Sequence, residues 1–142
     1  MSISNDQALA AILKRVKTVA LVGASHKTHR PSYKVMNYLL ENGYTVFPVN
    51  PVLSGRELLG QKVYGSLADI PETIDMIDVF RNASFLRQIV DDAISLKIDT
   101  IWTQLGVVDD SAIELAEKSG IEIVVDKCPA IELPRLRELG LI

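Results

Sequence analysis

The chain has 142 residues, 48% of them hydrophobic and 23% charged, which is the size and composition of one globular domain. Its net charge of −3 provides no overall basic field, which argues against nucleic acid and anionic membranes as partners. A single cysteine excludes an intrachain disulfide, and the N-terminal segment lacks a basic start followed by a long apolar run. We therefore expect a cytoplasmic protein with one domain over residues 1–142.

Short β-branched runs alternate with amphipathic stretches along the chain. The runs predict strands over residues 18–22, 45–49, 76–80, 100–103 and 121–125. Between them, the spacing of apolar residues and the capping signals predict helices over residues 6–16, 31–43, 84–96 and 110–120, with a short closing helix after Pro134. Residues 50–74 have scattered glycines and only a short helical candidate at residues 67–69, so they predict an irregular crossover.

Most of these strands are apolar on both faces, which is typical of parallel strands covered by helices on each side. The alternation predicts an α/β fold, a three-layer Rossmann-like doubly wound sheet with about five mainly parallel strands. We predict the strand order 3-2-1-4-5, which puts the ligand crevice outside the carboxyl ends of strands 1 and 4.

The loop after the first strand concentrates groups that bind anions. Gly23 allows a sharp turn, Ser25 and Ser32 offer hydroxyls, and Arg30 offers a planar fork of donors. A helix that starts at Pro31 directs backbone N–H groups and the positive end of its dipole at the same space. Together these features predict a site for a phosphate or a pyrophosphate.

The absence of known nucleotide-binding motifs restricts which phosphate ligand the loop can bind. The NAD fingerprint G-x-G-x-x-G is absent, because only Gly23 fits it and Ala24, Ser25 and Thr28 do not. Asn50 follows the second strand, at the place where an NAD site has an acidic residue. Because Asn50 has no negative charge, it does not repel a ligand with a phosphate near its ribose. NADP stays possible on this argument, whereas a P-loop for ATP is absent.

Five short motifs occur in order: VALVGAS....RPS, PVNP, DVFR, WTQLG and CPAIE. With these motifs, from about Val19 to Leu136, the chain resembles the stand-alone CoA-binding protein family, which is similar to the N-terminal CoA-binding domain of the succinyl-CoA synthetase alpha subunit. The resemblance implies a Rossmann-like fold that binds coenzyme A, usually without known catalysis.

The resemblance also implies which residues bind the ligand. Gly23, Ala24 and Ser25 correspond to contacts with the CoA phosphates, and Arg30, Pro31 and Ser32 stand beside them at the helix start. Asn50 and Pro51 correspond to the adenosine portion, Phe80 and Arg81 flank the nucleotide, and Gln104, Leu105 and Gly106 line the path of the pantetheine arm. Cys128 is expected at the same rim. Lys127, in place of the arginine frequent in the family, could lower the pKa of the thiol there, and the alternative is a small half-buried residue that only packs.

The sequence contains no catalytic constellation that we identify. A G-x-S-x-G nucleophile turn is missing, and both histidines, His26 and His29, lie in the phosphate loop without a third metal ligand nearby. We predict a non-catalytic protein without a metal that binds CoA or an acyl-CoA as a carrier, sensor or regulator. An NAD(P)-binding oxidoreductase or redox sensor, and the CoA-binding subunit of a two-chain acyl-CoA ligase, remain the alternatives; a protein partner or a homodimer is left open.

Overall fold

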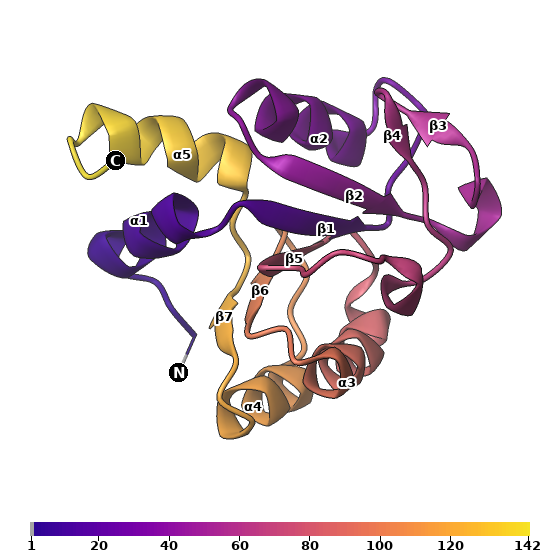
Figure 1. Cartoon of the computed structure of the whole chain (residues 1–142). Helices are drawn as coiled ribbons and strands as arrows, with labels where there is room; N and C mark the ends of the chain where they lie inside the picture. The colour runs from indigo at the N-terminus through magenta and orange to yellow at the C-terminus, as the bar shows by residue number, and fades with distance from the viewer. Residues whose placement is uncertain (1) are drawn as a thin grey trace.

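The structure, a computed structural model, describes residues 2–142 and contains a five-stranded parallel sheet (Figure 1). The strands are β1 (Thr18–Val22), β2 (Thr45–Val49), β5 (Met76–Val79), β6 (Thr100–Thr103) and β7 (Glu122–Val124). The α-helices are α1 (Asp6–Arg15), α2 (Pro31–Glu41), α3 (Leu86–Leu96), α4 (Asp110–Lys118) and α5 (Pro129–Glu138). The predicted α/β fold class is confirmed.

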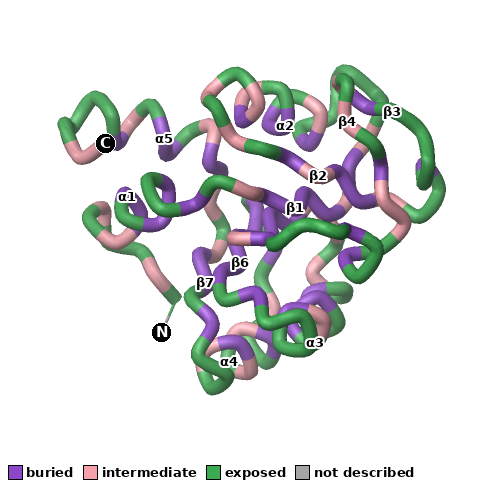
Figure 2. Tube along the Cα trace, viewed as in Figure 1, coloured by how far each residue is buried: buried purple, intermediate pink, exposed green. Residues whose placement is uncertain are grey.

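Helices cover both faces of the sheet, as Figure 1 shows: α1, α2 and α5 on one face and α3 and α4 on the other. Successive strand residues point to opposite faces, so Leu21 and Trp102 pack in the first core, whereas Ala20 and Ile101 pack in the second. Figure 2 shows the strands as the buried centre of the molecule. Within residues 2–142, no helix has the length and apolar character needed to cross a bilayer.

The order of the strands differs from the prediction. The sheet runs β2-β1-β5-β6-β7, which is 2-1-3-4-5 when its strands are counted along the chain, and not 3-2-1-4-5. The carboxylate of Asp75 accepts hydrogen bonds from the amides of Lys17 (2.8 Å) and Thr18 (3.1 Å), which fixes the start of β5 beside β1. In this order the switch point lies between β1 and β5, so the predicted crevice at strands 1 and 4 is also wrong.

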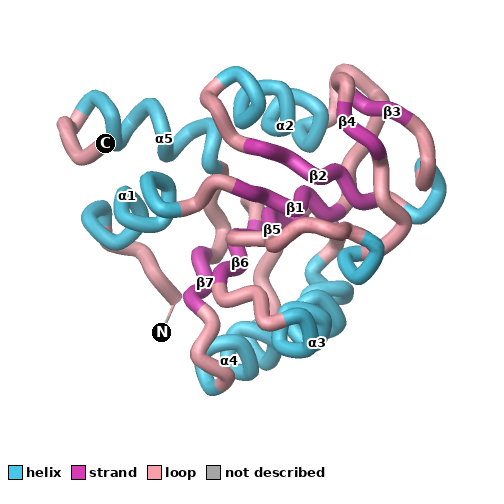
Figure 3. Tube along the Cα trace, viewed as in Figure 1, coloured by secondary structure: helices cyan, strands magenta, loops and turns pink. Residues whose placement is uncertain are grey.

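The crossover from β2 to β5 contains more structure than the sequence predicts (Figure 3). The 3-10 helix η1 (Pro51–Leu53) leads into an antiparallel pair, β3 (Glu57–Leu58) and β4 (Gln61–Lys62), and η2 (Leu67–Asp69) follows. Of these elements only η2 was predicted. Helix α5 also begins at Pro129 rather than after Pro134, because Pro129 suits the first helical position; Pro134 lies inside the helix.

Candidate functional site

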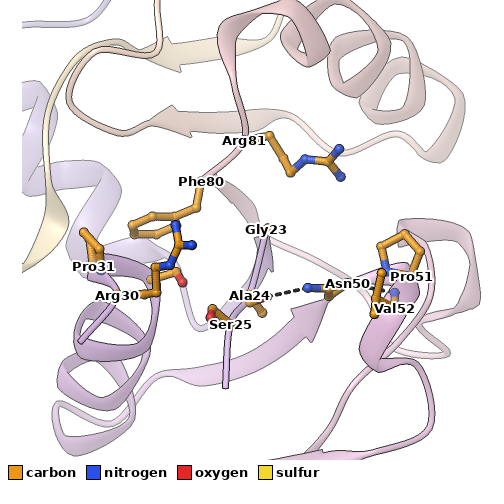
Figure 4. A pocket seen from close by; sticks show the side chains of 11 residues that line it. Gly23, Ala24, Ser25, Arg30, Pro31, Asn50, Pro51, Val52, Phe80 and Arg81 are labelled. Atoms are coloured by element: carbon orange, nitrogen blue, oxygen red, sulfur yellow. Dashed lines mark hydrogen bonds between the residues drawn. The ribbon is translucent and has the colours of Figure 1, made fainter. Parts of the chain in front are cut away.

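A cavity of about 500 Å³ opens at the carboxyl ends of β1, β2 and β5, around the switch point of the sheet (Figure 4). Its lining contains ten of the fourteen residues predicted to bind the ligand, together with Val52: Gly23, Ala24, Ser25, Arg30, Pro31, Ser32, Asn50, Pro51, Val52, Phe80 and Arg81. In Figure 4, Arg30, Pro31 and Phe80 lie on one side, and Asn50, Pro51 and Val52 lie on the other. Segments far apart in the sequence thus enclose one hollow.

Gly23 forms the floor of this hollow, and no other residue fits its position. Its φ of 92° lies in the region that favours glycine. A Cβ atom built on Gly23 would lie 2.5 Å from the carbonyl oxygen of Phe80, which is backbone and cannot move aside easily. The turn therefore requires glycine so that the ends of β1 and β5 can approach each other.

The hydrogen bonds of the loop restrict which groups can reach a ligand. The amides of Gly23 and Ala24 both donate to the carbonyl of Val49, at 3.0 and 3.2 Å. The side chain of Asn50 donates to the carbonyl of Ala24 (2.7 Å) and accepts from the amide of Val52 (2.9 Å). Gly23, Ala24 and Asn50 therefore shape the cavity, whereas their amide and side-chain hydrogen-bonding groups are already engaged by the protein.

Three other residues around the cavity can still donate hydrogen bonds to a ligand. Ser25 accepts a hydrogen bond from the amide of Lys27 (3.1 Å), which leaves its own hydroxyl proton to donate. The side chain of Arg30 is exposed and makes no capping bond at the start of α2. Within residues 2–142 the amide of Ser32 has no backbone acceptor, because it stands in the first turn of that helix. These three residues form the anion-binding part of the cavity, which we call the cradle.

Arg81 bounds the cavity from the β5 side. Its guanidinium carbon lies 3.9 Å from the ring centroid of Phe85, an arrangement that favours a flat, ordered guanidinium. Arg30 and Arg81 thus bring two cationic side chains to the wall of one cavity, with no acidic residue in its lining. This local field has the sign that a phosphate ligand requires, although the whole chain is slightly acidic.

The other four predicted residues follow β6 and β7 and do not line this cavity. Gln104 is buried, Leu105 is exposed, and the amide of Gly106 donates to the carboxylate of Asp126 (2.6 Å). Cys128 is buried and stands at the N-cap of α5. The predicted places of Gln104, Leu105 and Gly106 along the pantetheine arm, and of Cys128 at the same rim, stay predictions.

Gln104 donates a hydrogen bond of 2.7 Å to the Oδ1 atom of Asp78, whose side chain is fully buried on the neighbouring strand. The Oδ2 atom of Asp78 has no hydrogen-bond partner among the described residues. Burial raises the pKa of Asp78 to about 7, and the hydrogen bond from Gln104 opposes this shift only in part. The carboxyl group is therefore poised to change its charge near neutral pH.

The expected lowering of the Cys128 pKa is wrong. Burial raises the pKa of the thiol, and the nearby carboxylates of Asp78 and Glu132 raise it further, against hydrogen bonds from the amides of Ala130 and Ile131. A buried thiol with a raised pKa is a weak nucleophile. The geometry supports a packing role for Cys128.

One lining residue escaped the sequence reasoning. Val52 is 88% exposed at the edge of the cavity, held there by the bond between its amide and Asn50. An exposed valine carries no chemical signal in a sequence. Its position next to Pro51 could have been noted, because Pro51 was itself predicted to contact the ligand.

Most of the chain is similar to one known protein family. Residues 17–134 match the CoA binding domain family. The chain belongs to this family. The chain is also similar to the uncharacterized protein YneT of Bacillus subtilis, which is 32% identical over 117 residues that make up 82% of this chain and 85% of YneT.

Two further similarities place this CoA-binding domain among its relatives. A Thermus thermophilus structure, cell-free ID.343, superposes with a TM-score of 0.89 at 38% identity, covering 94% of this chain and 99% of that one. The alpha subunit of an ADP-forming acetate–CoA ligase I of Pyrococcus furiosus is 30% identical over 122 residues, 76% of this chain. The match spans only 26% of that ligase subunit, so this chain corresponds to about a quarter of it.

Proposed function

We propose that this chain binds coenzyme A or an acyl-CoA in the cavity at the switch point and does no chemistry by itself. The observation that carries the proposal is the cradle: Ser25, Arg30 and Ser32 direct unengaged donors into a cavity that lies at the β1–β5 switch point. Membership of the CoA-binding domain family supports the same ligand.

The cradle suits the diphosphate of the ligand. A hydroxyl, a guanidinium and a helix amide are the donors that hold phosphate oxygens in proteins, and α2 adds the positive end of its dipole. The cavity of about 500 Å³ has the volume of a site for one part of such a ligand. We infer that the pantetheine arm continues along the sheet edge toward Gln104 and Gly106.

Calorimetric titration tests this proposal with CoA, 3′-dephospho-CoA, acetyl-CoA, NAD and NADP. We expect CoA or acetyl-CoA to bind more tightly than either dinucleotide. Replacing Arg30 by Ala should weaken CoA binding by about 1.5–3 kcal/mol, roughly tenfold or more, through the loss of a charged hydrogen bond. Arg87→Ala, an exposed arginine on α3 outside the cavity, is the matched control and should leave the affinity unchanged.

Tighter binding of NAD or NADP, or equal loss in both arginine variants, would contradict the proposal. The absence of chemistry is tested separately by incubating the protein with acetyl-CoA and following free thiol. We expect the rate of thiol release to match that of buffer, and a protein-dependent release would show an enzyme.

A second candidate function follows from the ligase similarity. The shared 122 residues allow this chain to act as the CoA-binding component of an acyl-CoA ligase that needs a second chain. Mixing the chain with the remaining parts of such a ligase, then measuring ATP made from acetyl-CoA, ADP and phosphate, tests this. ATP formation that depends on this chain would favour the ligase component, and its absence would favour the independent binding protein.

A further inference from the structure

A second cavity, of about 170 Å³, lies against the α3 side of the sheet edge, next to the first one. Both cavities are lined by Pro51 and Arg81, so they adjoin at these two residues. Val22 and Val49, the last residues of β1 and β2, contribute apolar wall together with the buried side chain of Ile89 on α3. The second cavity is therefore a largely apolar annex to the first cavity.

Two polar side chains face this annex from consecutive turns of α3. The amide nitrogen of Gln88 donates a hydrogen bond of 2.9 Å to the Oδ1 atom of Asp92. This bond uses one donor and one acceptor, and neither side chain has another hydrogen-bond partner within residues 2–142. Gln88 Oε1 and Asp92 Oδ2 therefore remain as acceptors at the annex.

Building on the proposed function, we propose that the annex takes the purine base of the ligand and that Gln88 and Asp92 recognise the exocyclic amino group of that base. In this class of ligand one ribose joins the base to the diphosphate, and the annex adjoins the first cavity at Pro51 and Arg81. Neither side chain was among the predicted contacts, because both stand on a helix rather than at the tip of a strand.

The size of the annex fits a single flat ring system. An apolar protein cavity of about 150 Å³ is large enough to admit a benzene ring. The annex, at about 170 Å³ and open on one side, is too small for the whole ligand but can accept much of a base. The apolar walls from Val22, Val49 and Ile89 suit the faces of that ring.

The unused acceptors give the annex a chemical preference. Adenine presents an amino group as donor at its six position, whereas guanine and hypoxanthine present a carbonyl oxygen there. Gln88 Oε1 or Asp92 Oδ2 can accept from the amino group. A carbonyl oxygen at that place would face the carboxylate of Asp92 as a second acceptor, and only the remaining N–H of Gln88 could donate to it. The annex should therefore select a 6-aminopurine over a 6-oxopurine.

Arg81 has the position expected of a junction between base and phosphates. Its guanidinium is held over the ring of Phe85, and both residues line the annex. From this position the guanidinium of Arg81 can bind the phosphates of the ligand, while the carboxylate of Asp92 lies beside the base. This separation avoids placing a carboxylate against the phosphates.

Calorimetry with two probes tests the proposal: CoA and its hypoxanthine analogue, in which the amino group is replaced by an oxygen. Wild type should bind CoA about tenfold more tightly than the analogue. The analogue loses one hydrogen bond, and its oxygen is repelled by the carboxylate of Asp92. The double variant Gln88→Ala with Asp92→Ala should bind both probes alike. A double variant that kept the full preference would overturn the role of this pair.

A pair of tryptophan variants tests the annex itself. Ser66 lines the annex and makes no side-chain capping bond, so Ser66→Trp should fill the space with little cost to folding. Ala68→Trp, in the 3-10 helix η2 that Ser66 directly precedes but outside the annex, is the control. We expect Ser66→Trp to weaken CoA binding at least tenfold and Ala68→Trp to leave it within twofold.

The outcomes separate this inference from the proposed function. If wild type binds no CoA, the proposed function fails and the annex proposal with it. If wild type binds CoA and both tryptophan variants, shown to be folded by circular dichroism, bind it equally well, only the annex proposal fails. In that case a loss of affinity in Val52→Ser would place the base on the exposed rim of the first cavity.

Discussion

The buried carboxyl group of Asp78 should make the stability of this fold fall as the pH rises. Its pKa is about 7 in the folded chain against an ordinary value of 3.8, because burial disfavours the charged form. The folded state therefore holds a proton that the unfolded state has already lost, between about pH 4 and pH 7. The stability that this proton provides is complete below the lower value and is lost as the pH passes the upper one.

The size of the effect follows from the shift. At about 1.36 kcal/mol for each pKa unit, the shift to about 7 corresponds to a loss of ~4 kcal/mol over the whole range, of which ~2–3 kcal/mol falls between pH 5 and pH 8. Such a loss is a large part of the ~5–15 kcal/mol that stabilises an ordinary domain.

Urea unfolding of wild type and Asp78→Asn at pH 5 and pH 8 measures this directly. The asparagine keeps an oxygen for the hydrogen bond from Gln104 but cannot ionise, so its free energy of unfolding should change less with pH, by ~2–3 kcal/mol. Asp91→Asn, an exposed aspartate on α3, is the control and should follow wild type. Equal pH dependence in wild type and Asp78→Asn would show that the Asp78 carboxyl is not the source of the effect.

Three further changes test other parts of the structure. Gly23→Ala should lower the free energy of unfolding by ~2 kcal/mol or more beyond Gly43→Ala in urea titrations. Both glycines have positive φ, but only at Gly23 would the new Cβ strike backbone, so equal losses would contradict the close approach of Phe80. Asp75→Ala should cost about 1–3 kcal/mol through the lost bonds to the amides of Lys17 and Thr18, and the exposed Asp91→Ala should cost little. Cys128, buried and with a raised pKa, should react with Ellman's reagent at least about tenfold more slowly in the native protein than in urea, and a fast native reaction would show an accessible thiolate.

The sequence predicts the strands well because each of them is a local pattern. Runs such as that of β1 are short, apolar and β-branched, and their length alone sets them apart from helices. The strand order is not a local property. It depends on the path of residues 50–74, whose apolar residues Leu67 and Ile70 pack in the same core as α3 and carry the chain across to the far side of β1.

The hairpin of β3 and β4 was missed for a related reason. Its turn places Leu59 and Gly60 at φ values of 50° and 79°, a conformation that asparagine and glycine usually mark. Leucine at the first position gives no such signal. The strands are also only two residues each, too short for an alternating pattern.

The candidate site was likewise predictable only in part. Its members could be found because the tips of parallel strands meet at one edge of the sheet, whatever the order of the strands. The sequence could not predict which donors remain available to a ligand. The amides of Gly23 and Ala24 donate to the carbonyl of Val49, and these hydrogen bonds depend on how β1 and β2 lie together. The sequence did not point to Gln88 and Asp92, the contacts proposed for the base, because the outer face of a helix is usually just a solvated surface.

A crystal structure of the protein with bound CoA would show whether the cradle binds the diphosphate. We expect phosphate oxygens within hydrogen-bond distance of Arg30 and of the Ser25 hydroxyl or the Ser32 amide. CoA bound at another place, with no phosphate near these three residues, would contradict it.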